Sequence, residues 1–388
     1  MPPLIDNRIQ PIFKAPMFPP TEWTMASLRQ HLQAALCLEL STIPLYLFAG
    51  YSINTEGNNK GVEKSAQKTI LGIVKEEMLH LTIVGNCLTA LGGRPQLYGE
   101  AFAPTYPSRI LYEGVLMTLA PARQTQIENF MELEQPVDLP TTKGQNQPII
   151  GWEAPTYKSI GDFYQHIIKG IEKLDARITN GIFDPNSEKR QWGPADSGAP
   201  PHIAIIKDKT SALQQLNLVI AQGEGGPKEP LPDSHYGKFL ALSEREKDLD
   251  VYRLAPNPFT SEFKEVEETY AVMLAFDAAY SYLLWSIEAI WSYQGPDDGM
   301  IDQLKGNVDP LMTEIMSPFA RFLVKQKLRT IKGKNAAPPF NLYSFDLDSS
   351  PKNQLGAIIK GALNAYPNAP EFRDIGDALD ALCDLGDV

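Results

Sequence analysis

The chain has 388 residues, of which 43% are hydrophobic and 21% are charged. This length is more than a single hydrophobic core usually serves, so we expect one large domain with appendages, or two domains. A net charge of -12, with no basic stripe, argues against nucleic acid and an anionic membrane surface as partners.

The cysteine usage and the lack of a recognisable secretion signal lead us to expect a soluble cytoplasmic protein. The chain contains three widely spaced cysteines, Cys37, Cys87 and Cys383. No CxxC pair is present, which argues against a zinc knuckle or a dithiol redox site and favours reduced thiols. Residues 1–24 are rich in proline and lack an apolar signal core, so they are expected to form an N-terminal arm.

Two long helices are predicted first. Apolar residues recur at helical spacing over residues 25–51, with Thr24 as N-cap and Pro44 as a source of a kink. A second helical pattern over residues 62–91 ends at two consecutive glycines. Because only a short polar loop separates these helices, we expect them to form an antiparallel hairpin.

Residues 93–157 contain many prolines and are predicted to be a long excursion with one helix near Glu113. Beyond it, helical patterns recur over 159–174, 207–222, a short segment from residue 235, 261–293 and 302–327. Strand signals are weak, so the predicted class is all-α. We expect a helical bundle over 25–250, a helical extension over 251–335, and a linker with a short helical tail over 336–388.

The apolar helix near residues 270–291 contains Asp277 and Glu288, which argues for a buried helix rather than a membrane span. Asp277 is expected to be a hydrogen-bond partner of Tyr280 or of another tyrosine.

Acidic residues interrupt the apolar stripes of the first two helices. Glu39 lies between Leu36 and Ile43, and Glu77 occupies the equivalent position in the second helix, with His80 on the same face at i+3. A buried ionised carboxylate is costly unless it is paired or binds a metal. A pair of such carboxylates with a Glu-x-x-His step is typical of ferritin-like di-iron bundles. Glu76 competes with Glu77 for this role, but Glu77 lies on the apolar stripe.

A dinuclear site needs a second set of ligands, and here the pattern is weaker. Glu224 follows an apolar helix, and His235 comes eleven positions later across a glycine-rich link. The alternative is that these are a loop carboxylate and a histidine at a helix start. Glu172, at the edge of an apolar face, is the weakest candidate.

Several motifs resemble the ferritin-like domain of iminophenylpyruvate dimer synthases, enzymes of violacein and related bisindole pathways. The first helix carries Leu36-Cys37-Leu38-Glu39 and the second carries Glu76-Glu77-Met78-Leu79-His80. Later matching motifs are Gln222-Gly223-Glu224-Gly225 and Ser234-His235-Tyr236-Gly237-Lys238-Phe239. The resemblance covers about residues 27–242, implies a ferritin-like fold and favours Glu224 and His235 as ligands. With the helical patterns above, the expected architecture is a four-helix bundle with long inserted loops and additional C-terminal helices.

Together these patterns favour a metal- and dioxygen-dependent oxidoreductase acting on a small, amino-acid-derived molecule in secondary metabolism. The expected cofactor is a pair of iron ions, with manganese as the alternative metal. The expected metal ligands are Glu39, Glu77, His80, Glu224, His235 and, as a sixth, Glu172. The rival hypotheses are an iron-binding ferroxidase or storage protein, and a non-catalytic interaction protein with a vestigial site. Self-assembly into a homo-oligomer stays open.

Overall fold

The computed structural model describes residues 16, 19–57, 60–109, 116–136, 157, 159–223, 231–245, 249–264, 268–296 and 298–386. Within these ranges the structure is almost entirely helical, which confirms the predicted all-α class. The two strands in the described part, β1 (Ser108–Arg109) and β2 (Leu116–Met117), form a short antiparallel pair.

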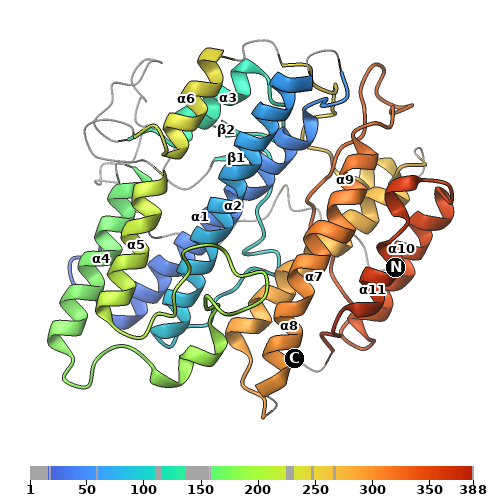
Figure 1. Ribbon diagram of the computed structural model, residues 1–388. Helices are drawn as coiled ribbons and strands as arrows, with labels where there is room; N and C mark the ends of the chain where they lie inside the picture. The colour runs from blue at the N-terminus through green and yellow to red at the C-terminus, as the bar shows by residue number, and fades with distance from the viewer. Residues whose placement is uncertain are drawn as a thin grey trace.

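Four helices form a bundle on one side of the molecule (Figure 1): α1 (Met25–Ser52), α2 (Lys60–Ala90), α4 (Ile160–Arg177) and α5 (Lys209–Gly223). Helix α1 packs on α2 and α4, and α5 packs on the same two helices, so each member contacts two neighbours. The predicted ranges of these helices agree with the observed ones to within a few residues.

Local chemistry sets the start of α1. The Thr24 hydroxyl accepts from the backbone N–H of Ser27 at 3.1 Å, and the Ser27 hydroxyl accepts from the backbone N–H of Thr24 at 2.9 Å. This reciprocal capping satisfies two backbone donors that the helix itself cannot. The helix then continues without a break through Pro44.

Two shorter helices, α3 (Gln124–Leu133) and α6 (His235–Arg245), pack against each other at one end of the bundle (Figure 1). The rings of Phe130 on α3 and Phe239 on α6 have centroids 5.2 Å apart, and both contact Tyr46 of α1. Helix α3 lies within residues 93–157, for which the sequence predicted a long, largely irregular segment. The helix expected near Glu113 falls outside the described residues.

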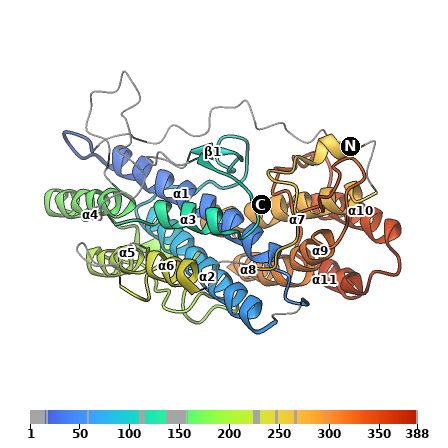
Figure 2. The ribbon, with the colours of Figure 1, turned by 90° about the horizontal axis from the view of Figure 1, so that it is seen from above.

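Five further helices lie beside the bundle (Figure 2): α7 (Tyr270–Ser292), α8 (Asp298–Pro310), α9 (Ser317–Leu323), α10 (Pro351–Ala365) and α11 (Ile375–Ala381). Helix α10 packs along α7, so the C-terminal tail folds onto helices of its own chain. Short 3-10 turns occupy Pro185–Arg190, Thr260–Phe263 and Pro370–Phe372.

Two predicted C-terminal helices differ from the observed ones. The helix expected from residue 261 begins only at Tyr270, after a 3-10 turn. The helix expected over 302–327 is interrupted by a π-helical turn at Leu311–Met316, directly after Pro310. Proline lacks a backbone N–H, so the hydrogen-bond register of a helix readily shifts next to it.

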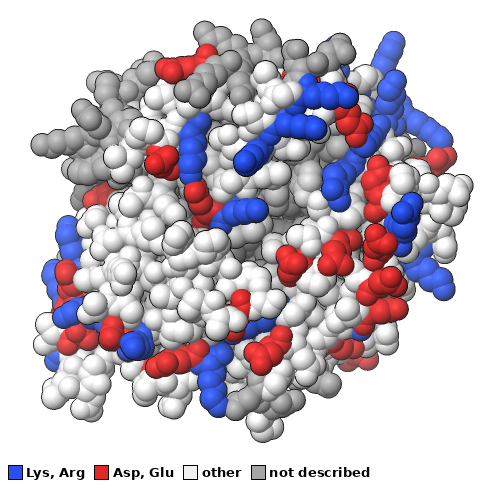
Figure 3. Space-filling view, in the orientation of Figure 1, with Lys and Arg blue, Asp and Glu red and all other residues white. Residues whose placement is uncertain are grey.

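Helices α1 and α7 are long and apolar enough to span a membrane by length and composition. Their most apolar windows are 89% and 78% buried inside the fold, which is typical of core helices. On the face of the molecule seen in Figure 3, basic and acidic side chains are interspersed, and no broad area is covered by Lys and Arg alone.

Asp277 is fully buried in the middle of α7 and joins three segments of the C-terminal half. Its carboxylate accepts from the Thr260 hydroxyl at 2.6 Å and from the backbone N–H of Asn341 at 2.9 Å. The expected hydrogen bond to Tyr280 is wrong, because the Tyr280 hydroxyl makes no hydrogen bond in the structure. Burial raises the pKa of Asp277 well above its usual value of 3.8, although both hydrogen bonds act to lower it.

We expect Asp277→Asn to flatten the dependence of folding stability on pH. A carboxyl whose pKa is raised by folding stabilises the fold below its unfolded pKa, and this contribution is lost as pH rises through the folded pKa. The contribution of Asp277 to the free energy of unfolding should therefore fall as pH rises above about 4, and the variant should lack this contribution. Urea denaturation at several pH values measures this.

Asp208→Asn is the control, because hydrogen bonds from Ser211 lower the pKa of that exposed carboxyl. Its removal should shift the pH slope in the opposite direction. Equal slopes in the parent and Asp277→Asn would show that Asp277 does not gain a proton on folding.

Candidate metal centre

Glu39 of α1 points into the bundle and is buried. Its Oε1 accepts a short hydrogen bond from the Tyr164 hydroxyl of α4, and its Oε2 lies 3.4 Å from His80 Nδ1. Glu39 lies on the apolar stripe of α1, and the helical period turns that stripe toward the other helices. Glu39 is therefore held by two neighbouring helices at once.

Glu77 of α2 presents its two carboxylate oxygens to two different histidines. Its Oε1 lies 2.7 Å from His235 Nδ1, and its Oε2 lies 3.9 Å from His80 Nδ1. The Thr42 hydroxyl donates to Oε2 at 2.8 Å and fixes the carboxylate plane from α1. One carboxylate therefore lies beside both imidazoles of the cluster.

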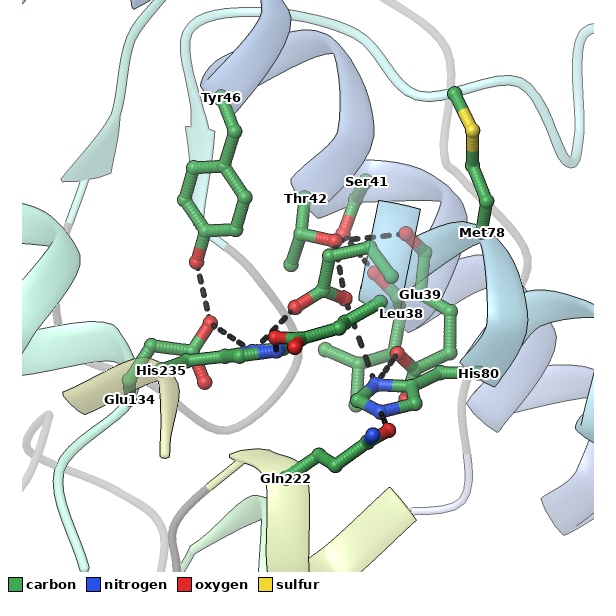
Figure 4. A network of polar contacts seen from close by, with 12 residues as sticks. Leu38, Glu39, Ser41, Thr42, Tyr46, Met78, His80, Glu134, Gln222 and His235 are labelled. Atoms are coloured by element: carbon green, nitrogen blue, oxygen red, sulfur yellow. Dashed lines mark hydrogen bonds and ion pairs between the residues drawn. The ribbon is translucent and has the colours of Figure 1, made fainter. Parts of the chain in front are cut away.

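The two imidazoles come from different elements and lie face to face. His80 of α2 and His235 at the start of α6 have ring centroids 5.3 Å apart and planes inclined by 25°. Both side chains are buried. Figure 4 shows them on either side of the acidic cluster, with Gln222 of α5 below His80.

Glu134 is a further buried carboxylate, located just after the last residue of α3. Its Oε1 accepts a short hydrogen bond from the Tyr46 hydroxyl and lies 3.7 Å from His235 Nδ1 (Figure 4). It converges on the centre because α3 packs on α6, whose first residue is His235. The sequence prediction missed it.

Close packing of these groups shifts their pKa values. Burial, with the nearby carboxylates of Glu134 and Glu39, raises the pKa of Glu77 to about 7 against the opposing effect of His235. Burial also acts to raise the pKa of Glu39, but His80 and the Tyr164 hydroxyl outweigh it and the pKa is lowered. Burial acts to lower the pKa of His80, but its bond to Glu39 raises it overall. The metal-free cluster thus holds protons that a cation would displace.

The set of ligand atoms suits a divalent metal cofactor. Oxygen from carboxylates and nitrogen from imidazoles are the ligands that iron and manganese commonly take. His235 Nδ1 is buried and lies 2.7 Å from Glu77 Oε1 and 3.7 Å from Glu134 Oε1, without a hydrogen bond of good geometry to either. The ligand atoms of Glu77, His80 and His235 all lie within 4.8 Å of one another, close enough to share a metal ion.

A small cavity lies between these groups, and its remaining walls are mostly apolar. Leu38, Ile160, Val219 and Ile220 line it together with the carboxylates and imidazoles. An apolar wall lowers the local dielectric and strengthens the attraction between carboxylates and a bound cation.

The structure brings four of the six predicted ligands together: Glu39, Glu77, His80 and His235. Glu76, the rival of Glu77, lies partly exposed behind His235 instead of facing the cavity. Glu224 lies outside the described residues. Metal binding by these residues stays a prediction.

Glu172 is not part of the cluster. It is exposed on α4, eight residues beyond Tyr164 and hence about 12 Å further along the helix axis. Its position at the edge of the apolar face does not bring it to the level of the site. Glu134 supplies an additional carboxylate in the cluster. The only signal for it in the sequence is the short apolar pattern of Ile127, Phe130 and Leu133 just before it.

Two characterised enzymes are similar to this chain. Dichlorochromopyrrolate synthase of Lentzea aerocolonigenes is 23% identical over 384 residues, which cover 84% of this chain and 36% of that enzyme. The 2-imino-3-(indol-3-yl)propanoate dimerase of Chromobacterium violaceum is 24% identical over 363 residues, covering 81% of this chain and 34% of that enzyme. The chain thus spans about a third of the length of these curated relatives. Both are of the iminophenylpyruvate dimer synthase type, which confirms the resemblance seen in the motifs.

A solved structure shares the fold. The crystal structure of a ferritin-like protein from Caulobacter vibrioides, at 1.95 Å resolution, superposes with a TM-score of 0.51 and 24% identity. The match covers 75% of this chain and 96% of that one. The sequence of residues 32–244, more than half of the chain, matches the ferritin-like family as a whole. This range contains every residue of the acidic and imidazole cluster, and the chain belongs to the ferritin-like family.

Proposed function

We propose that this protein is a di-iron oxidase or oxygenase that acts on a small, amino-acid-derived metabolite. The observation that carries the proposal is the convergence of three carboxylates and two imidazoles on one buried cavity. The proposed ligands are Glu39, Glu77, His80, Glu134 and His235. Bound iron, when reduced, supplies the electrons for reducing dioxygen.

The chain's own residues prepare such a site. Tyr46 and Tyr164 each donate a hydrogen bond to one terminal carboxylate, which fixes the orientation of Glu134 and Glu39 before any cation arrives. The buried position of the cluster excludes bulk water from the reacting groups. Rigid placement on helices is what a catalytic constellation requires.

The substrate class is inferred from the relatives. One of them is named for its action on an imine of indolyl propanoate. This chain matches only about a third of that enzyme, so we propose the broader class of imines and related oxidation products of amino acids. Manganese suits the same ligands as iron, so the oxygen uptake of the manganese-loaded protein is the comparison for the iron-loaded protein in the same assay.

The test is anaerobic loading of the purified full chain with Fe(II), followed by elemental analysis and exposure to dioxygen. We expect about two irons per chain and oxygen uptake that increases when an aromatic amino-acid imine is supplied. Oxygen uptake coupled only to iron oxidation, with or without organic substrate, would replace this proposal with a ferroxidase. Absence of bound metal after loading would contradict both.

A further inference from the structure

The two imidazoles of the metal centre are held from behind by different groups. His235 Nε2 lies 3.0 Å from Glu76 Oε2. His80 Nε2 lies instead 2.9 Å from the amide oxygen of Gln222, below it in Figure 4. Both partner atoms are acceptors, so each Nε2 carries the hydrogen. The Nδ1 atom of each ring is therefore the one available to bind a metal.

The group behind His235 is charged and fixed. Lys238 Nζ contacts both oxygens of Glu76, at 2.7 and 2.5 Å. This ion pair holds the carboxylate of Glu76 in place against His235 Nε2. Both Glu76 and Lys238 are partly exposed, so substitutions there do not open the core.

The two halves of the cluster contain the same kinds of side chain. Glu77 directs one oxygen at each histidine, at 2.7 Å from His235 Nδ1 and 3.9 Å from His80 Nδ1. One half contains Glu134, bonded to a tyrosine, and the other contains Glu39, also bonded to a tyrosine. The groups that hold the two rings differ in charge, because the acceptor behind His235 is a carboxylate and the acceptor behind His80 is an amide.

A carboxylate behind a metal-binding histidine orients the ring and makes its free nitrogen a better electron donor than a neutral amide does. We propose that the two metal positions are unequal, and that the position formed by His235, Glu134 and Glu77 Oε1 fills before the position formed by His80, Glu39 and Glu77 Oε2. Glu76 and Gln222 act as positioning residues that set this order. The inference rests on the proposed dinuclear site.

The order of filling is testable by titrating metal-free, full-length protein with Co(II) without oxygen, following visible absorption and competition with a chelator of known affinity. The parent protein should bind two ions in two resolved steps. Glu76→Gln should weaken the first step by about 10- to 100-fold and leave the second step near its parent value. Gln222→Glu should tighten the second step and reduce the difference in affinity between the two steps.

Two control variants separate the charge behind His235 from other effects. Lys238→Gln breaks the same ion pair but leaves the carboxylate behind the ring, so the first step should stay close to that of the parent. Glu172→Gln removes an exposed carboxylate of α4 and should leave both steps unchanged.

The outcomes separate this inference from the proposed function. Two ions that bind with equal affinity, or a Glu76→Gln variant that weakens both steps alike or neither, would overturn the unequal positions and leave the dinuclear site intact. A parent protein that binds no Co(II) or Fe(II) would overturn the dinuclear site and the inference together.

Discussion

Glu77→Gln is expected to abolish high-affinity binding of both metal ions. The side chain of Glu77 is the only one in the described cluster with an oxygen directed at each of the two histidines. Removal of its charge should therefore weaken metal binding at both histidines. We expect a loss of at least about 100-fold in affinity, because removing a group that only hydrogen-bonds to a metal ligand already costs up to that much. Elemental analysis after anaerobic Fe(II) loading and gel filtration measures it.

We expect the Glu77→Gln variant to stay folded, so that a loss of metal affinity is not caused by unfolding. Because burial already raises the pKa of Glu77 to about 7, a neutral amide resembles the protonated carboxyl of the metal-free protein. The Gln variant should therefore keep its helical circular dichroism and a cooperative unfolding transition at pH 7. Glu172→Gln, on an exposed position, is the matched control and should retain full metal content. Two irons per chain in the Glu77 variant would remove Glu77 from the ligand set.

Gly85→Ala is expected to destabilise the fold by about 1–3 kcal/mol, the usual cost of overpacking a core. A Cβ at this position of α2 would lie 2.1 Å from Cζ2 of Trp291, a residue of α7. The indole cannot move aside freely, because it is fully buried and its Nε1 donates to Asn86 Oδ1 at 3.2 Å. Asn86 is itself fixed by two hydrogen bonds to the backbone of Trp192.

Gly72→Ala provides the control on the same helix. Gly72 is exposed, and nothing lies within 4 Å of the position that a Cβ would take. Alanine there should stabilise the fold by up to about 1 kcal/mol through helix propensity alone. Urea denaturation of both variants gives the comparison. If Gly85→Ala were as stable as Gly72→Ala, the contact between α7 and the bundle would be loose rather than interlocked.

Sequence periodicity was enough to find the part of the site that lies on long helices. Glu39 and Glu77 stand out because each occupies a position where the helical period requires an apolar residue. His80 follows from Glu77 by the i+3 rule alone. The same periodicity misplaced Glu172, because a position on a helix face does not say how far along the helix the site lies.

The sequence by itself determined the all-α class, the hairpin of α1 and α2, and the three polar residues that these helices contribute to the buried cluster, because those features depend on contacts within a few residues. Only the tertiary structure decided the rest. Glu134 and His235 lie far apart in the sequence and meet because α3 and α6 pack together. Asp277 pairs with Thr260 and Asn341 instead of Tyr280 for the same reason. Such contacts depend on how whole helices pack against one another, and local sequence periodicity does not predict that packing.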